Sequence, residues 1–194
     1  MATVLVYYAT GEGQTAKIAR KIGETIKERG HEVTTVDAAA EPADLAIDDY
    51  DVVIVGASIH AGKEQLGIRD FVTANREALA GLPTAYFQVS LSAAADQTAE
   101  QAAEYVENFI EATGWQPDRI AQFGGALRFS EYGFLKRFMV KQVVKREWPE
   151  LDTSQDAEFT DWQAVQDFAA DVAAFAEGRL GIAPPAASRE GTDE

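Results

Sequence analysis

The stretch that most constrains the fold lies at residues 3–15, where an apolar run leads directly into a turn rich in Gly and Thr. The run from Val4 to Tyr8 is β-branched, aliphatic and aromatic without alternation, which is typical of a strand buried on both faces of a parallel sheet. Beyond the turn, apolar residues recur at helical spacing as far as Ile26. The sequence therefore predicts a strand, a tight turn and a helix over residues 13–29.

The turn at residues 10–15 has the composition of an anion-binding loop. Backbone N–H groups at a helix N-terminus point outward, and the helix dipole favours negative charge there. Gly11 and Gly13 let the backbone approach an anion closely, and Thr10 and Thr15 add hydroxyl donors. The turn lacks both the lysine of a nucleoside triphosphate loop and the three-glycine spacing of a dinucleotide loop. Such a loop suits one phosphate monoester; an ordinary strand-to-helix turn with a threonine cap is the alternative.

Length and composition limit the class of protein. The 194 residues suffice for one domain with a sizeable core, and a net charge of −15 argues against general nucleic-acid binding. The absence of cysteine excludes disulfides and thiolate metal sites, and two histidines are too few for a histidine metal cluster, so we expect no metal. No apolar stretch approaches about 20 residues and no leader is apparent, so we expect a cytoplasmic protein.

The acidic balance also bears on the solvent that the protein meets. Lysine is scarce while Asp and Glu are abundant, and the predicted outer helix faces carry the acids. A salt-rich cytoplasm would screen the repulsion within such a surface. We therefore expect a halophile-like protein, with an ordinary acidic protein as the alternative.

Downstream of the first helix, short apolar runs alternate with amphipathic stretches, which predicts a doubly wound α/β fold with a five-stranded parallel sheet. The further strands are expected at 32–36, 51–56, 83–89 and 119–123, and the further helices at 66–80, 97–113 and from about 161 to 176. Ligands of such sheets bind beyond the carboxyl ends of the strands. Three predicted loops meet this description, at residues 10–15, 56–62 and 90–95, although small residues also make plain compact turns.

Residues 126–148 form a basic insertion after the fifth strand, with a local charge of +4 against −19 for the rest of the chain. From Phe134 onward, apolar residues repeat at helical spacing with Lys and Arg between them. A basic, aromatic, amphipathic helix can lie on an anionic membrane surface or accept a flat acidic ligand. The alternative is a helix that packs its apolar side on the domain and pairs its basic side with the acidic body.

The loop at 10–15 resembles the FMN-phosphate loop of flavodoxins, which typically reads Ser/Thr-x-Thr-Gly-x-Thr. Thr10, Gly13 and Thr15 match this pattern. Glu12 stands where a threonine is usual, and its carboxylate has to point away from a bound phosphate.

Residues 3–176 resemble the flavodoxin-type, menaquinone-dependent protoporphyrinogen dehydrogenase family. The most specific matches are Trp-Gln-Pro-Asp-Arg at 115–119 and Gly-Gly-Ala-Leu-Arg at 124–128. The resemblance implies FMN as cofactor and electron transfer from protoporphyrinogen, in haem biosynthesis, to a quinone. It implies these cofactor-binding residues: Thr10, Gly11, Glu12, Gly13, Gln14, Thr15, Ala57, Ser58, Ile59, His60, Ser90, Leu91, Ser92 and Ala93.

The resemblance also assigns the basic insertion to the porphyrin or to peripheral contact with the inner face of the cell membrane. Arg128, Lys136 and Arg137 are then candidates for pairing with substrate propionates. His60 is the one imidazole near the expected site and a candidate proton carrier, with a surface-loop histidine as the alternative. We expect residues 1–177 to form the FMN-binding domain and 178–194 a flexible acidic tail.

Three other functions fit the sequence. The chain could be a flavodoxin that carries electrons between partners, or a quinone-linked flavin reductase with another substrate. It could also be a flavin-free interaction module that has kept the fold. The acidic surface fits an electron carrier, but the basic insertion fits it poorly.

Overall fold

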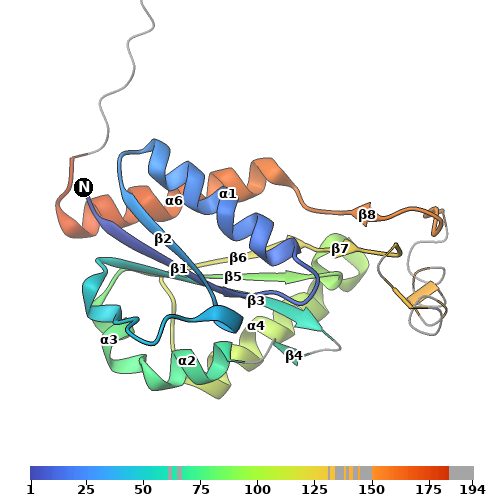
Figure 1. Cartoon of the computed structure of the whole chain (residues 1–194), viewed down its shortest axis with the longest axis horizontal. Helices are drawn as coiled ribbons and strands as arrows, with labels where there is room; N and C mark the ends of the chain where they lie inside the picture. The colour runs from blue at the N-terminus through green and yellow to red at the C-terminus, as the bar shows by residue number, and fades with distance from the viewer. Residues whose placement is uncertain are drawn as a thin grey trace, which may run out of the picture.

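Five strands form a parallel sheet in the order β2-β1-β3-β5-β6 (Figure 1). The computed structural model describes residues 1–60, 63–64, 67–130, 132–133, 138, 140–141, 144 and 150–183. The five strands are β1 (Thr3–Ala9), β2 (Glu32–Asp37), β3 (Val52–His60), β5 (Thr84–Ser90) and β6 (Arg119–Gly124). From β1 the chain first adds β2 on one side and then crosses back to add β3, β5 and β6 on the other. This confirms the predicted doubly wound fold, with its switch point between β1 and β3.

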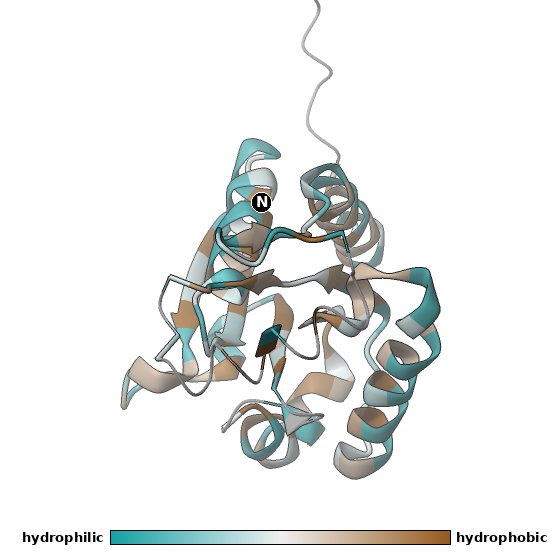
Figure 2. Cartoon of the chain, turned by 90° about the vertical axis from the view of Figure 1, so that its right-hand side faces the viewer, coloured by the Kyte–Doolittle hydropathy of each residue, from teal (hydrophilic) through white to brown (hydrophobic). Residues whose placement is uncertain are grey.

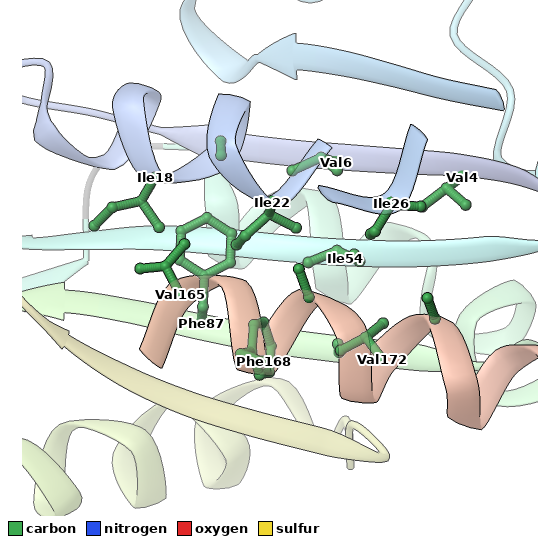
Figure 3. Packing of buried hydrophobic residues seen from close by; sticks show 14 of the residues in the cluster. Val4, Val6, Ile18, Ile22, Ile26, Ile54, Phe87, Val165, Phe168 and Val172 are labelled. Atoms are coloured by element: carbon green, nitrogen blue, oxygen red, sulfur yellow. The ribbon is translucent and has the colours of Figure 1, made fainter. Parts of the chain in front are cut away.

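Helices cover both faces of the sheet. Figure 1 shows α1 (Gln14–Glu28) and α6 (Trp162–Leu180) on one face, and α2 (Ile68–Ala74), α3 (Arg76–Gly81) and α4 (Ala99–Thr113) on the other. The apolar stripes of α1 and α6 meet the sheet in one cluster, where Ile22 and Phe168 pack beside Phe87 (Figure 3). A second cluster lies under α2 and α4 and contains the stacked rings of Tyr7 and Phe71. The β1 run is buried between the two clusters, as predicted.

Several boundaries differ from the sequence-based ones. The predicted helix at 66–80 is two helices, because Asn75 leaves helical geometry and its side chain donates to the Phe71 carbonyl, at 2.8 Å. Residues 97–98 belong to a short 3-10 helix (Asp96–Thr98), one of four such turns among the described residues, and α4 begins only at Ala99. Two of the others, Ala38–Ala40 and Ile47–Asp49, lie in the stretch between β2 and β3. The helix α6 ends at Leu180, beyond the expected domain boundary at 177, and the tail from 184 lies outside the described residues.

A short hairpin and a separate two-stranded ribbon lie at the carboxyl end of the sheet. β4 (Lys63–Glu64) pairs antiparallel with the end of β3, so residues 57–60 belong to a strand and are not the loop that was predicted. β7 (Ala126–Leu127) pairs antiparallel with β8 (Ala157–Glu158), and this ribbon extends past the end of the sheet in Figure 1. The insertion therefore starts and ends close to the carboxyl edge.

Figure 2 views the molecule from the side at which the parallel strands end. The inner strands carry hydrophobic segments and the surrounding helices carry hydrophilic ones. The register places Ala9 beside Ala57, Ser58 beside Val89, and Ser90 beside Gly124. Three chain segments that were predicted to lie together, at 10–15, 57–60 and 90–93, are thus neighbours along one edge.

Candidate functional site

The loop that leads into α1 is shaped by one glycine and one threonine. Gly13 has φ +84°, in the left-handed region that glycine adopts without strain. Its N–H donates to the Thr10 hydroxyl at 2.9 Å, and its carbonyl accepts the first helical hydrogen bond, from the Lys17 N–H at 3.2 Å. The N–H groups of the first turn have no partner within the helix itself. The loop therefore presents backbone donors at the positive end of the helix dipole.

Thr15, in the first turn of α1, has a buried hydroxyl that lacks a hydrogen-bond partner. The residue is 1% exposed, and its Oγ1 bonds to no other protein group. Burying a hydroxyl without a partner costs about 1–3 kcal/mol. A ligand oxygen at this end of the helix would satisfy the group, so Thr15 is the strongest single sign of an anion site here.

The Gln14 side chain is held by segments from the far end of the sequence. Its amide nitrogen donates to the Thr160 hydroxyl at 2.8 Å, and that hydroxyl donates to the Gly124 carbonyl at 2.7 Å. Its amide oxygen faces the Arg128 guanidinium, with Nη2 at 3.4 Å. Gln14 can therefore contribute only its backbone N–H to a phosphate, while its side chain ties the loop to the β6 end and the start of α6.

Glu12, the acid in the loop, is turned towards the insertion. Its Oε2 accepts a hydrogen bond of 2.6 Å from the Tyr132 hydroxyl, which in turn accepts one from the Arg128 N–H at 3.2 Å. Burial, and then the hydrogen bond to Glu12, raise the pKa of the Tyr132 hydroxyl, which therefore remains a proton donor. The sequence did not point to Tyr132, which lies 120 positions after Glu12.

The second predicted segment, residues 57–60, is the end of β3 and leads into the β4 hairpin. Ala57 is buried, Ser58 and Ile59 are half-buried, and His60 is exposed. His60 pairs across the hairpin with Lys63. Side chains alternate along a strand, so only every second residue here can face a given side of the edge.

The third predicted segment folds into a 3-10 turn (Ser92–Ala94) after β5. The Ser90 hydroxyl accepts from the Ala93 N–H at 3.1 Å, and the Ser92 hydroxyl donates to Gln101 Oε1 at 2.7 Å. These hydroxyls are already bonded within the protein. Leu91 packs against a third apolar cluster, which places this turn beside the insertion.

That third cluster joins the two ends of the insertion. Its buried members are Leu127, Phe129 and Val144, and Leu151, Ala157 and Phe159 pack against them. The described residues Phe138, Val140, Lys141 and Val144 are helical, as the periodicity predicts. Phe138, which the pattern placed on the apolar side, is 57% exposed, while Val144 is buried. The candidate substrate residues Lys136 and Arg137 lie outside the described residues.

The flavodoxin domain family matches residues 5–154 of the chain. The chain belongs to the flavodoxin-domain family. Protoporphyrinogen IX dehydrogenase (quinone) of Escherichia coli strain K12 is 34% identical to this flavodoxin-domain chain over 172 residues, covering 87% of this chain and 93% of that protein. The protein of the same name from Leishmania major is 30% identical over 176 residues, covering 88% of this chain and 74% of that protein.

Among solved structures, a short-chain flavodoxin associated with a bacterial microcompartment matches this flavodoxin-domain chain with a TM-score of 0.57. The two share 15% identity, and the match covers 91% of this chain and 99% of the flavodoxin. At that identity the match bears on the fold alone, and it agrees with the strand order. Within the described part of the chain, each helix is too short or too polar to cross a bilayer.

Proposed function

We propose that the chain is an FMN-dependent oxidoreductase that takes electrons from a porphyrinogen and passes them to a quinone. The observation that carries the proposal is the 34% identity to a protoporphyrinogen IX dehydrogenase (quinone) over 93% of that protein's length. Membership of the flavodoxin-domain family and the shape of the 10–15 loop support the cofactor.

The loop fits the phosphate of FMN. The buried, unpartnered Thr15 hydroxyl and the N–H groups of the first turn of α1 would donate to the phosphate oxygens. Thr10 would support the loop through its bond from the Gly13 N–H, and Gly11 and Gln14 would contribute backbone only.

The flat ring of FMN would lie between the ends of β3 and β5. Ala57, Ser58, Ile59 and His60 would flank it on one side, and Ser90, Leu91, Ser92 and Ala93 on the other. Because the Ser90 hydroxyl is already bonded to the Ala93 N–H and the Ser92 hydroxyl to Gln101, backbone amides and the Leu91 side chain would make most of the contact. The clustering of Leu91 with Leu127 and Phe129 would exclude water from that side.

FMN, when bound, supplies the acceptance and onward transfer of electrons, and the protein supplies position and electrostatics. His60, exposed at the end of β3, would carry away a proton released by the substrate. His60→Gln should then lower turnover without loosening FMN. An unchanged turnover would remove His60 from the reaction.

Lys136 and Arg137 would pair with substrate propionates. Charge reversal at either should raise the porphyrinogen KM while the FMN affinity stays the same. An unchanged KM would discard this assignment.

Peripheral contact with a membrane through residues 126–148 forms part of the proposal. The local charge of +4 and the exposed Phe138 support it, because basic and aromatic side chains bind anionic bilayers together. Binding to vesicles with and without anionic lipid would test this, and equal absence of binding to both would refute it.

The decisive experiment is anaerobic reduction of the FMN-reconstituted protein by protoporphyrinogen in high salt, followed at the flavin absorbance band. Free FMN at the same concentration controls for reduction without protein. Bleaching by protoporphyrinogen, followed by recovery on addition of a menaquinone analogue, is the expected result.

Two outcomes would overturn the proposal in different ways. Bound flavin that protoporphyrinogen cannot reduce would favour an electron carrier or another quinone-linked reductase. A chain that binds no flavin at all would favour an interaction module.

A further inference from the structure

Arg128, at the end of the β7 strand, has a buried donor without an acceptor. Its Nε is fully enclosed and makes no hydrogen bond. Its Nη2 reaches Gln14 Oε1 only at 3.4 Å, a weak contact for a charged donor. Within the described residues, no carboxylate lies at ion-pair distance from this guanidinium. A guanidinium that is partly enclosed and unpaired is costly, because burial removes its water without replacing it.

Arg128 lies beside the 10–15 loop and the start of α1. Its Nη2 contact is to Gln14, the first residue of α1, and its backbone N–H is bonded to Tyr132, which holds Glu12. Arg128 is therefore linked to the 10–15 loop at Gln14 directly and at Glu12 through Tyr132. The buried, unpartnered Thr15 hydroxyl lies in the same first turn of α1. Thr15 at the start of α1 and Arg128 against Gln14 thus each have a buried donor without a protein partner, a combination that suits an anionic ligand.

The acid in the loop is compatible with this arrangement. Glu12 would repel a phosphate if its carboxylate pointed into the loop. Its Oε2 instead bonds to the Tyr132 hydroxyl, on the side of the insertion. Arg128 brings a positive charge to the start of α1, where its Nη2 contacts the Gln14 side chain. The loop thus gains a cation from the insertion to offset the acid in its own sequence.

We propose that Arg128 is a ligand of the cofactor phosphate, contributed from the insertion, and not a ligand of substrate propionates. This rests on the proposed function only as far as FMN binding. A fork of N–H donors matches phosphate oxygens in charge and geometry. The start of the insertion would then contribute to cofactor binding. The preference of the site for FMN over a flavin without phosphate would depend on Arg128.

The test compares FMN and riboflavin, which differ only in the phosphate. Their dissociation constants would be measured by quenching of flavin fluorescence, for the wild type, Arg128→Gln and Arg128→Lys. For Arg128→Gln we expect roughly 10- to 100-fold weaker FMN binding, because one charge-assisted contact is lost, and riboflavin binding within about twofold of wild type. Arg128→Lys keeps the positive charge but loses the forked arrangement of N–H donors. Its FMN dissociation constant should lie between those of the wild type and Arg128→Gln.

Arg20→Gln is the matched control. Arg20 lies on α1 but is exposed and donates to the Ala16 carbonyl of the same helix, so Arg20→Gln removes the same charge without changing a side chain of the 10–15 loop or of the insertion. Its FMN affinity should stay within about twofold of wild type at moderate salt. Circular dichroism and the unfolding midpoint without flavin would check that each variant folds. If Arg128→Gln does not fold, Arg128→Lys carries the comparison.

Three results would overturn the inference. Equal weakening of FMN and riboflavin would mean that Arg128 supports the loop without touching phosphate. Unchanged FMN binding would mean that it faces something else. A raised porphyrinogen KM with unchanged FMN affinity would return it to the substrate. A wild type that binds FMN but is not reduced by protoporphyrinogen would overturn the proposed function and leave this inference standing.

Discussion

At the scale of single residues, we expect the Thr15 hydroxyl to contribute to FMN affinity and not to the stability of the flavin-free protein. Its hydroxyl is buried without a partner, so Thr15→Val should weaken FMN binding by roughly 10- to 100-fold and leave the flavin-free stability unchanged or slightly higher. Thr113 is an equally buried threonine whose hydroxyl donates to the Phe109 carbonyl at 2.8 Å. Thr113→Val should show the opposite pattern, losing about 1 kcal/mol of stability with normal FMN affinity. Fluorescence titration and urea unfolding would measure both, and a loss of flavin-free stability in Thr15→Val would contradict this account.

Gly56, in the centre of β3, shows how closely the layers pack beside the site. A Cβ placed there would lie 2.1 Å from Phe87 Cζ, the ring that fills the cluster under α1 and α6 (Figure 3). Gly56→Ala should therefore destabilise the protein by about 1–3 kcal/mol or more. Gly81, where a Cβ would meet nothing within 4 Å, is the control, and Gly81→Ala should change stability by no more than about 0.5 kcal/mol. Rescue of Gly56→Ala by Phe87→Leu would confirm the cause, whereas equal unfolding midpoints for the two alanine variants would contradict it.

The sequence identified the loop residues of the site but not the residues that hold the loop. Thr10, Gly13 and Thr15 lie within one short turn, so their chemistry can be predicted from the local pattern. Tyr132 and Thr160 reach the same loop through hydrogen bonds that span 120 and 146 positions. Such contacts join segments that are far apart in the sequence, and the local spacing of residue types does not predict them.

At the scale of elements, α6 is fastened to the end of α1 and the start of β2 by one buried carboxylate. Glu177 accepts two hydrogen bonds from Arg29, the shorter at 2.8 Å, and lies 3.0 Å from His31 Nε2. Burial alone would raise the pKa of Glu177, but the hydrogen bonds from Arg29 and His31 outweigh it and lower that pKa. The Ala2 N–H donates to His31 Nδ1, so Nε2 carries the proton in this arrangement.

The lowered pKa predicts a pH dependence with a definite sign. Because the folded carboxyl has the lower pKa, its contribution to stability is complete above the pKa of an unfolded glutamate and is lost as pH falls through the folded value. Glu177→Gln should cost about 1–2 kcal/mol at pH 7, and the gap to wild type should narrow below about pH 4. Urea unfolding of both proteins from pH 3 to 8 would measure it. A gap that stays constant or widens in acid would contradict the assignment.

The strands and helices with the clearest local sequence pattern were the ones predicted correctly. The runs in β1, β3 and β5 are mostly apolar, and each strand was expected within a few residues of its place. The continuation of β3 through residues 57–60 was missed, because it depends on pairing with β4 and not on its own pattern. The break at Asn75 was missed, because the apolar stripe continues across it while the amide bonds back to Phe71. The pairing of β7 with β8 joins segments about 30 positions apart and had no local signal.

At the scale of the whole molecule, opposite charges are concentrated in different segments of the chain. The body carries −19 and residues 126–148 carry +4. The base of this basic segment packs on the carboxyl edge through Leu127, Phe129 and Val144, beside the loops of the candidate site. An acidic body with a basic segment at the site mouth would draw an anionic ligand to that edge and repel it elsewhere.

The same charge distribution makes stability depend on salt. Mutual repulsion across a surface with 32 acidic and 17 basic residues destabilises the compact state, and salt screens it. Raising KCl from about 0.1 M to 1 M shortens the screening length from about 10 to 3 Å. If this screening raises the free energy of unfolding by about 2 kcal/mol, Tm should rise by about 4–8 °C.

A variant of the acidic face of α4 separates screening from a general effect of salt on hydration. Glu100, Glu104, Glu107 and Glu111 are exposed and spaced at three or four residues, where like charges repel. Replacing all four with Gln should raise Tm in 0.1 M KCl and reduce the further rise in 1 M KCl, because less repulsion remains to be screened. Thermal unfolding of the FMN-saturated proteins at both salt concentrations would measure this. A wild type that is destabilised by molar salt, or a variant with the same salt dependence as wild type, would show that the acidic surface is not what limits stability at low salt.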